Sequence, residues 1–379
     1  MNQSPNSEPQ IPSQPNIDPK ASSIGPLKAI IALSLAILVT LAFSGCTSST
    51  PTAAPSLSSS LIGGDERGAS HEDLARYYAP VINQGVASNQ DFITAVDFDG
   101  DWIGNNNWEN QPTGDLSAYV YYSVVETETH WFLFYALFHP RDYTRDPCEQ
   151  SDGCHENDME SIQVVVAKND MPFGRLQAVE TLAHSHIYLY TADRSVSGNF
   201  LKVKGSVRLE ESHPVVYVET YGHGIYAQRK ILVPYRVVYR VGERAEVPES
   251  LQDKDISYQL VSIYDTLWVR RDEIGEGRAF DQPFDYRGHV LPAAIDGDDY
   301  GEDKANTPWG YNQETGDTLS RGDWFLDPAR ALAFHARFDG DFSLKYVYNP
   351  YLADLGLGDG ATILRHLALE VKCAPGMPR

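Results

Sequence analysis

One short stretch of the chain combines several side chains that could bind a cation. Asp158 and Glu160 precede an apolar run from Ser161 to Ala167. If they begin a strand, their i, i+2 spacing places both carboxylates on one face. His155 lies in the preceding loop and can fold back toward them, while Asp142 follows an earlier apolar strand. Three carboxylates and one imidazole suit a divalent cation completed by water, such as Mg²⁺, Ca²⁺ or Mn²⁺, with Mg²⁺ or Ca²⁺ favoured over Zn²⁺.

These side chains also have a purely structural interpretation, as salt bridges and loop-capping hydrogen bonds. Under the metal interpretation, His184, His186 and His223 are candidate catalytic acids or bases, or further ligands. His184 and His186 are two residues apart, so on a strand they would share a face; strand-edge hydrogen bonding is the alternative. His223 lies between two glycines, where a ligand can approach closely.

The four cysteines indicate chemistry outside the cytoplasm. Cys148 and Cys154 are six residues apart in a polar loop that ends beside His155, which predicts a small disulfide ring. A metal-thiolate site is the alternative, and it would need further ligands at CxxC-like spacing. Cys373 is then unpaired, as expected of a buried inert thiol.

The N-terminus has the layout of a secretory signal. Lys28 precedes an apolar run from Ala29 to Phe43, which ends in Phe43-Ser44-Gly45-Cys46 and resembles a bacterial lipobox. We therefore predict a signal peptide over residues 1–46 and a lipid on Cys46. An uncleaved single-pass membrane anchor is the alternative, although the run is short for one, and a secreted soluble form is a third. Thr47 rather than Asp follows the cysteine, which points to the outer membrane if the host is Gram-negative.

The rest of the chain predicts a flexible tether followed by one β-rich domain. Residues 47–67 are rich in Ser, Thr and Pro, and residues 68–379 form the predicted domain. Apolar runs at 118–125 and 129–138 are joined by a short polar segment, as in an antiparallel hairpin, and both are apolar on both faces.

We predict an antiparallel β-sandwich with long loops and a few short helices. Its other expected strands span residues 161–167, 176–181, 186–190, 215–221, 233–241 and 256–263. The expected helices lie at 328–337, with Asp327 as N-cap and Pro328 in the first turn, and at 361–367.

Composition excludes several functions. The net charge is −22, and no block of Lys and Arg follows residue 46, so the surface repels polyanions and nucleic acid is excluded as a partner. No Gly-x-Ser-x-Gly elbow, phosphate loop or dinucleotide fingerprint occurs in the sequence, so a serine hydrolase or nucleotide enzyme has no support.

The order Asp142, then His155-x-x-Asp158-x-Glu160, then an aliphatic strand resembles the necrosis- and ethylene-inducing peptide-like proteins. Two later segments are also similar to that family, namely Ala183-His184-Ser185-His186 and His213-Pro214-Val215-Val216-Tyr217-Val218 with its following Gly222-His223. Fungal vacuolar-sorting-like proteins of the same wider β-sandwich superfamily share this second segment. The chain departs from the toxin motif at Glu156, Asn157 and Met159, where the family has Arg, His and Trp.

The resemblance implies that Asp142, His155, Asp158 and Glu160 bind a cation, which in the toxin family helps to recognise sphingolipid head groups. We therefore expect an exported, membrane-tethered lipoprotein of the cell envelope, whose cation site binds a glycan or a lipid head group. The alternatives are a metal-dependent hydrolase of the envelope and a scaffold without a ligand.

Overall fold

The structure is a computed structural model of the 379-residue chain. It describes the following residues: 69–151, 153–228, 235–297, 300–301, 305–311 and 319–360. The predicted signal peptide, Cys46, the tether, the helix at 361–367 and Cys373 lie outside them. All described residues belong to one compact unit, Gly64–Arg379. Within them, no helix is long and apolar enough to cross a membrane.

The described part of the chain is mostly β. Its strands are β1 Val81–Gly85, β2 Tyr119–Thr127, β3 His130–Asp142, β4 His155–Ala167, β5 Arg175–Ala183, β6 His186–Thr191, β7 Val196–Gly198, β8 Val203–Ser206, β9 Leu209–Glu210, β10 His213–Val218, β11 Ile225–Tyr226, β12 Arg236–Val241, β13 Ile256–Ser262, β14 Pro283–Tyr286, β15 His289–Pro292, β16 Ala336–Phe338 and β17 Tyr346–Tyr348. The strand at 161–167 was predicted too short, because β4 already begins at His155.

Short helices occupy the connections. They are α1 His71–Tyr77, α2 Asn107–Asn110, α3 Asp323–Leu326, α4 Pro328–His335 and α5 Pro350–Asp354, with 3-10 turns η1 Asn89–Asp91, η2 Gly104–Asn106, η3 Cys148–Gln150 and η4 Trp268–Arg270. The helix predicted from Pro328 is confirmed as α4, and Asp327 holds its N-cap position. The Asp327 carboxylate accepts hydrogen bonds from Arg287 and Tyr346 instead of capping the helix.

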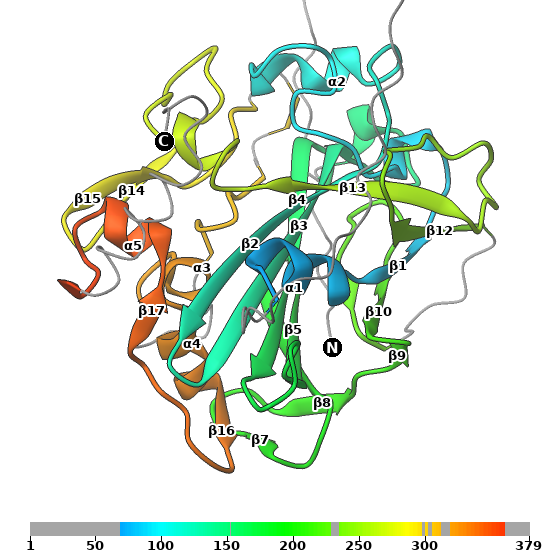
Figure 1. Cartoon of the computed structure of the whole chain (residues 1–379). Coiled ribbons are helices and arrows are strands. Elements are labelled where there is room, and N and C mark those ends of the chain that lie inside the picture. The colour runs from blue at the N-terminus through cyan, green and yellow to red at the C-terminus, as the bar shows by residue number, and fades with distance from the viewer. Residues whose placement is uncertain are drawn as a thin grey trace, which may run out of the picture. The chain divides into compact units, whose positions relative to one another are not determined.

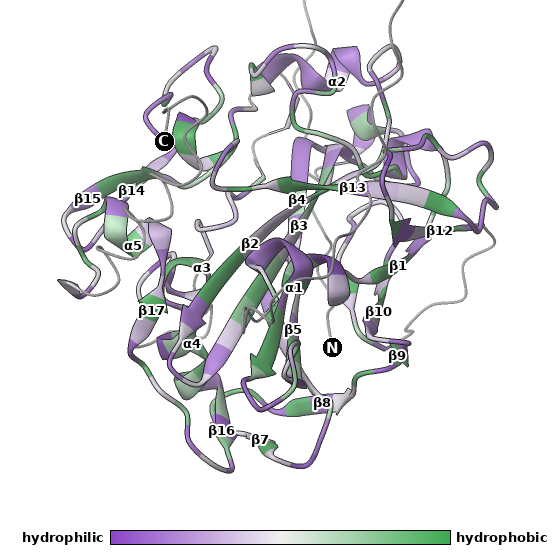
Figure 2. Cartoon of the chain, viewed as in Figure 1, coloured by the Kyte–Doolittle hydropathy of each residue, from purple (hydrophilic) through white to green (hydrophobic). Residues whose placement is uncertain are grey.

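The predicted central hairpin is confirmed. Strands β2 and β3 pair antiparallel, with Tyr121 opposite Ala136 and Glu126 opposite Trp131. β3 continues into an antiparallel pair with β4, and β4 into β5. Long stretches of β2 and β5 are hydrophobic (Figure 2), and almost every residue of β4 and β5 is buried. Burial on both faces explains why these runs lack the polar alternation of a wetted sheet.

The antiparallel character of the predicted sandwich is wrong for part of the sheet. The large sheet has the order β11-β10-β1-β12-β13-β2-β3-β4-β5-β6-β8. Four of its pairs are parallel: β1 with β10, β12 with β13, β13 with β2, and β6 with β8. Neighbours in sequence can pair through tight turns, whereas these partners are joined by longer crossovers, which permit the parallel direction.

The two-layer sandwich itself is not confirmed, because most described strands form this one mixed sheet, which is strongly curled (Figure 1). The edge strand β11 contacts β4 and β5, which lie far from it in the strand order. One hydrophobic core includes Ile82 of β1 and Tyr239 of β12 together with Val164 of β4. Curling lets a single sheet bury its own inner face.

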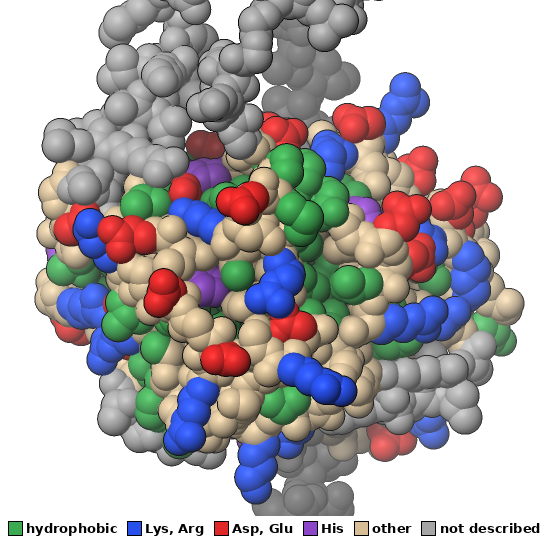
Figure 3. All heavy atoms as spheres, turned by 60° about the horizontal axis from the view of Figure 1, so that its bottom comes forward, with side chains coloured by type: hydrophobic (Ala, Val, Ile, Leu, Met, Phe, Trp, Pro, Cys, Tyr) green, Lys and Arg blue, Asp and Glu red, His purple; other side chains and the backbone are tan. Residues whose placement is uncertain are grey.

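On the face shown in Figure 3, Lys and Arg side chains lie among Asp and Glu side chains. Ion pairs between the two kinds of side chain occur among the described residues, for example between Lys345 and Glu128 at 2.8 Å. An interspersed surface of this kind favours solubility over the steering of a polyanion.

Candidate functional site

The four predicted cation ligands lie on the paired strands β3 and β4. Asp142, the last residue of β3, stands directly opposite His155, the first residue of β4. Asp158 stands opposite His139, and Glu160 lies two residues further along β4. His155 therefore belongs to the strand, not to the preceding loop as predicted. The antiparallel register brings two segments of the sequence to one place.

A single left-handed residue decides which way these side chains point. In an uninterrupted strand, residues three apart such as His155 and Asp158 face opposite sides of the sheet. Asn157 has φ 58° and lies opposite the region of Pro140, where the register between β3 and β4 skips a pair. Proline has no N–H for the ladder, so the interruption costs little there. Because the alternation is broken at Asn157, the side chains of Asp142 and His155 line the same cleft as those of Asp158 and Glu160.

Asn157 is anchored from outside the two strands. Its buried side-chain amide donates to the carbonyls of Gly104 (3.0 Å) and Asp296 (2.6 Å), and its oxygen accepts from Asn107 (2.8 Å). Glu156 is held nearby, since its backbone N–H donates to the carbonyl of Tyr300 at 3.0 Å. Asp296 and Tyr300 thus contact β4 through their backbone carbonyls, and Asp296 itself is buried.

We expect Asn157→Gly to be less destabilising than Asn157→Ala, by about 1 kcal/mol. Both variants lose the three side-chain hydrogen bonds, but only glycine adopts the left-handed backbone without a Cβ clash. In a regular strand or helix the order would be reversed, because glycine costs more conformational entropy than alanine. Denaturant unfolding of the two variants measures the difference. Equal stabilities, or a more stable alanine variant, would contradict the positioning role of Asn157.

The convergent side chains line a cleft of about 350 Å³, which we call the acidic cleft. Its lining includes all four predicted ligands and one predicted catalytic histidine, His184. The complete lining is Asp142, Gly153, His155, Asp158, Glu160, His184, Ser185, Gly222, Ala305, Asn306 and Tyr311. Gly222 leaves space in the cleft, since a Cβ there would lie 3.1 Å from the His184 ring and 3.4 Å from Oδ2 of Asp142. A substituted residue would crowd the cleft.

The buried carboxyl group of Glu160 has no positively charged partner among the described residues. Its side chain is buried, Oε1 accepts the backbone N–H of His184 at 2.6 Å, and Oε2 has no hydrogen-bond partner among the described residues. Burial raises its pKa well above the ordinary value, and the charge of Asp158 raises it further. Burial likewise raises the pKa of Asp142. A dication would supply the missing positive charge.

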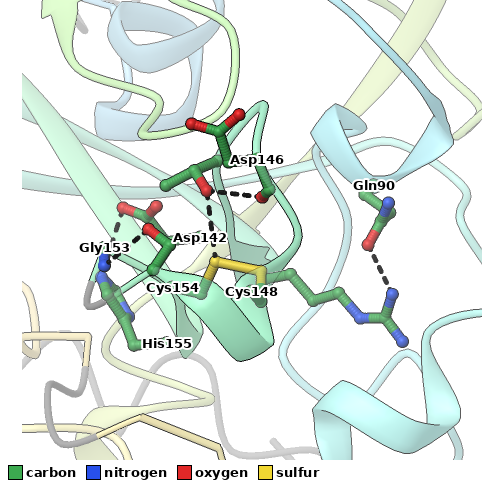
Figure 4. Close-up of a disulfide and its surroundings, with 10 residues drawn as sticks. Gln90, Asp142, Asp146, Cys148, Gly153, Cys154 and His155 are labelled. Atoms are coloured by element: carbon green, nitrogen blue, oxygen red, sulfur yellow. Dashed lines mark hydrogen bonds and ion pairs between the residues drawn. A yellow bond between two sulfur atoms is a disulfide. The ribbon is translucent and has the colours of Figure 1, made fainter.

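His155 and Asp142 form an ion pair at the rim of the cleft. His155 Nε2 lies 3.2 Å from Oδ2 of Asp142, and the two side chains point toward each other in Figure 4. Burial lowers the pKa of His155, but the hydrogen bond and charge of Asp142 outweigh this effect and raise it to about 9. His155 is therefore protonated at neutral pH in this geometry. It would have to lose that proton to ligate a metal through the same nitrogen.

The two histidines predicted to share a strand face are separated by a turn. β5 ends at Ala183 and β6 begins at His186, so His184 and Ser185 form the hairpin turn, with φ 57° at His184. His184 and His186 therefore do not share a strand face. His184 lines the acidic cleft, whereas His186 is exposed and does not.

His184 is paired with a carboxylate. Its Nε2 lies 2.5 Å from Oε1 of Glu219. That hydrogen bond, which outweighs partial burial, raises the pKa of His184. The raised pKa favours the protonated form, in which a half-exposed imidazole at the cleft could donate a proton or bind an anionic ligand group.

His223 lies behind the cleft and is fully buried. Its Nδ1 lies 2.9 Å from Oδ2 of Asp158 and its Nε2 lies 3.2 Å from Oδ1 of Asp91. Burial alone would lower the pKa of His223, but the two carboxylates raise it to about 10. Both ring nitrogens therefore donate, and His223 is a buried imidazolium that orients Asp158.

His139 completes this buried group. Its ring stacks on His223 with centroids 3.7 Å apart, and burial together with the charge of His223 holds its pKa well below the ordinary value. Nδ1 of His139 is buried and has no partner among the described residues. Ligand atoms of His139, Asp158 and His223 lie within 4.8 Å of one another, so the three could hold a metal ion. His223 would first have to lose a proton and one carboxylate contact.

Asp91 and His139 were not among the site residues predicted from the sequence. Asp91 is 132 residues from His223 and belongs to the 3-10 turn η1, where it accepts from Tyr143 (2.6 Å) and from the N–H of Ala87 (2.7 Å). No local pattern marks such a residue. The polar stretch around it resembles many surface turns.

The predicted disulfide is confirmed. Cys148 and Cys154 are bonded with a Cα–Cα distance of 5.6 Å, and Figure 4 shows the bond beside Asp142 and His155. Gly153, inside the ring, lines the acidic cleft, and Cys154 is buried next to His155. The ring therefore holds one wall of the cleft.

We expect the double variant Cys148→Ser/Cys154→Ser to lose about 2 kcal/mol of stability, because the cross-link closes a short loop of the unfolded chain. Differential scanning calorimetry with and without a reductant measures this loss. The melting temperature of the variant should not change when the reductant is added, whereas that of the wild-type protein should fall. A wild-type melting temperature that does not respond to complete reduction would contradict the prediction.

No protein-family model matches this chain, and no curated protein matches it. Solved structures similar to part of it include the Necrosis and Ethylene inducing Protein 2 from the causal agent of cocoa's Witches Broom disease, with 16% identity, a TM-score of 0.29, and coverage of 52% of this chain and 76% of that one. The non-toxic HaNLP3 protein has 12% identity and a TM-score of 0.29, over 53% and 79% of the two chains. NLPPya in complex with glucosamine has 17% identity and a TM-score of 0.26, over 49% and 70%. These are toxin-fold relatives of the family that the motifs resemble, but TM-scores this low carry no argument about function.

Proposed function

We propose that this protein is exported and tethered to an envelope membrane by a lipid on Cys46, and that its acidic cleft binds a divalent cation. Asp142, Asp158 and Glu160 would supply oxygen ligands, with His155 at the rim, and the cation would in turn hold a glycan or a lipid head group. The signal peptide over residues 1–46 and the tether over 47–67 belong to the same proposal.

The observation that carries the proposal is the uncompensated carboxylate of Glu160. A buried carboxylate oxygen without a donor, close to two further carboxylates, is costly unless something positive binds there. Three oxygen ligands from the paired strands β3 and β4, together with an open cleft, suit Mg²⁺ or Ca²⁺ completed by water. The buried group of His139, Asp158 and His223 is richer in nitrogen, so a site there would suit Zn²⁺ better.

A metal-dependent hydrolase of the envelope remains the second candidate, favoured by one observation. The paired His184 and Glu219 lie beside the carboxylates, where a protonated imidazole could serve as a general acid. His186 is exposed and His223 is buried behind Asp158, so neither is placed for that role as well as His184.

Metal analysis of the purified full-length chain, followed by titration with Mg²⁺ and Ca²⁺, tests the proposal. We expect one dication per chain in the wild-type protein and none in Asp158→Ala. Binding to glycan and lipid arrays with and without the ion then tests the ligand. Turnover of phosphodiester or ester substrates that is lost in Asp158→Ala would favour the hydrolase, and an absence of dication binding would refute both.

A further inference from the structure

A second cleft lies away from the acidic cleft and shares no lining residue with it. It has a volume of about 320 Å³ and forms where the loop before η2 meets β2 and β13. Four aromatic side chains and two carboxylates line it together with three other residues: Phe98, Trp102, Tyr119, Tyr121, Asp97, Asp115, Ala95, Val261 and Thr266. We call it the aromatic cleft.

The aromatic side chains that line this cleft differ in how deeply they are buried. Tyr121 and Phe98 are buried, whereas Trp102 and Tyr119 are partly exposed and form the open part of the cleft. The Tyr121 hydroxyl accepts the backbone N–H of Val96 at 2.8 Å. Its own proton has no acceptor among the described residues. The deepest wall therefore offers an unused polar group as well as a π face.

Two carboxylates accompany these rings. Asp97 is half-buried, and burial raises the pKa of its carboxyl group, which indicates poor hydration. Asp115 uses one oxygen to accept from the N–H (3.0 Å) and hydroxyl (2.7 Å) of Ser117. No described Lys or Arg forms an ion pair with either carboxylate. The cleft thus combines negative charge with aromatic faces.

One cation already lies on these walls. The Arg270 guanidinium carbon lies 3.9 Å from the ring centroid of Trp102, and its charge lowers the pKa of Asp97. Arg270 makes no ion pair with a carboxylate in the described part of the chain, and its Nη1 lies 3.5 Å from the Thr266 carbonyl. Arg270 therefore already places a positive charge on the Trp102 ring and is the internal competitor of any cation that binds there.

We propose that the aromatic cleft binds a small organic cation, with an ammonium head between the Trp102 and Tyr119 rings and the carboxylates of Asp97 and Asp115. Cation–π attraction and charge-assisted hydrogen bonds act together in such a site. The net charge of −22 also raises the local concentration of cations around the protein. This binding is independent of the acidic cleft and of its dication.

Choline and its neutral carbon isostere, dimethylbutanol, provide a matched pair of probes. Both have the same shape, so only the charge distinguishes them. Calorimetric titration of the full-length chain should show choline binding at least about tenfold more tightly than dimethylbutanol. Equal affinities, or binding of neither compound, would overturn the proposal.

Two variants test the residues. Asp97→Asn should weaken choline binding about tenfold and leave dimethylbutanol binding unchanged, whereas Asp272→Asn, an exposed change of equal charge outside the cleft, should affect neither. Arg270→Gln should strengthen choline binding, because it removes the competing guanidinium from Trp102. Equal choline affinities for Asp97→Asn and Asp272→Asn, or weaker binding by Arg270→Gln, would overturn the proposal even if one variant folded poorly.

Discussion

Glu160→Gln is expected to reduce dication affinity by more than about 100-fold while making the metal-free protein more stable. Loss of a partner that only orients a ligand typically costs about 10–100-fold in metal affinity, and Glu160 would be a ligand itself. The amide keeps the shape and can still accept the N–H of His184, which Glu160 binds at 2.6 Å. It also removes a buried carboxyl group whose second oxygen has no hydrogen-bond partner in the part of the chain that the structure describes.

The gain in stability should be about 1–3 kcal/mol and should depend on pH. The folded pKa of Glu160 is raised well above the ordinary value of 4.5, so the wild-type protein loses stability as pH rises above that value. The advantage of the glutamine variant should therefore be larger at about pH 8 than at about pH 5.

Chemical unfolding in a chelator and titration with Ca²⁺ measure the two effects, with the exposed Glu273→Gln as a control that should change neither. If Glu160→Gln destabilises the metal-free protein and leaves affinity unchanged, the acid cluster is a structural element.

His223→Ala is expected to lose about 3–5 kcal/mol of stability, the cost of breaking a buried ion pair. The side chain of His223 has no exposed surface, and its removal leaves the buried carboxylates of Asp91 and Asp158 without their shared cation. His223→Asn should lose less, because asparagine tolerates the left-handed backbone at φ 48° and its amide can donate one hydrogen bond.

This loss should also depend on pH. The pKa of His223 is raised from 6.5 to about 10, so its contribution is fully present below pH 6.5 and disappears as pH rises toward about 10. The pKa of Asp91 is lowered from 3.8, against the raising effect of burial, so its contribution is lost as pH falls below that value. The loss of stability caused by His223→Ala should therefore be largest between the ordinary pKa of Asp91, 3.8, and that of His223, 6.5.

Guanidinium unfolding at several pH values tests the prediction, with His289→Ala outside this network as the matched control. A penalty that stays constant from about pH 6 to about pH 9 would contradict the buried imidazolium.

Local features of the sequence predicted the pieces of the site. The hairpin of β2 and β3 follows from two apolar runs around a short polar segment, and α4 follows from Pro328 at its first turn. Cys148 and Cys154 are close enough in sequence for a ring to be expected, and it is confirmed. Asp158 and Glu160 lie on a strand, as their spacing before an apolar run indicated. All these features depend on contacts between residues near one another in the chain.

Only the tertiary structure decided how the pieces meet. The left-handed Asn157, held by segments 50 and 139 residues away, breaks the alternation that would have separated His155 from Asp158. The turn at His184 parts it from His186, and the parallel strand pairs join segments remote in sequence. Periodicity encodes the face of a strand but not its partners, because pairing depends on long-range burial and on hydrogen bonds that local patterns do not contain.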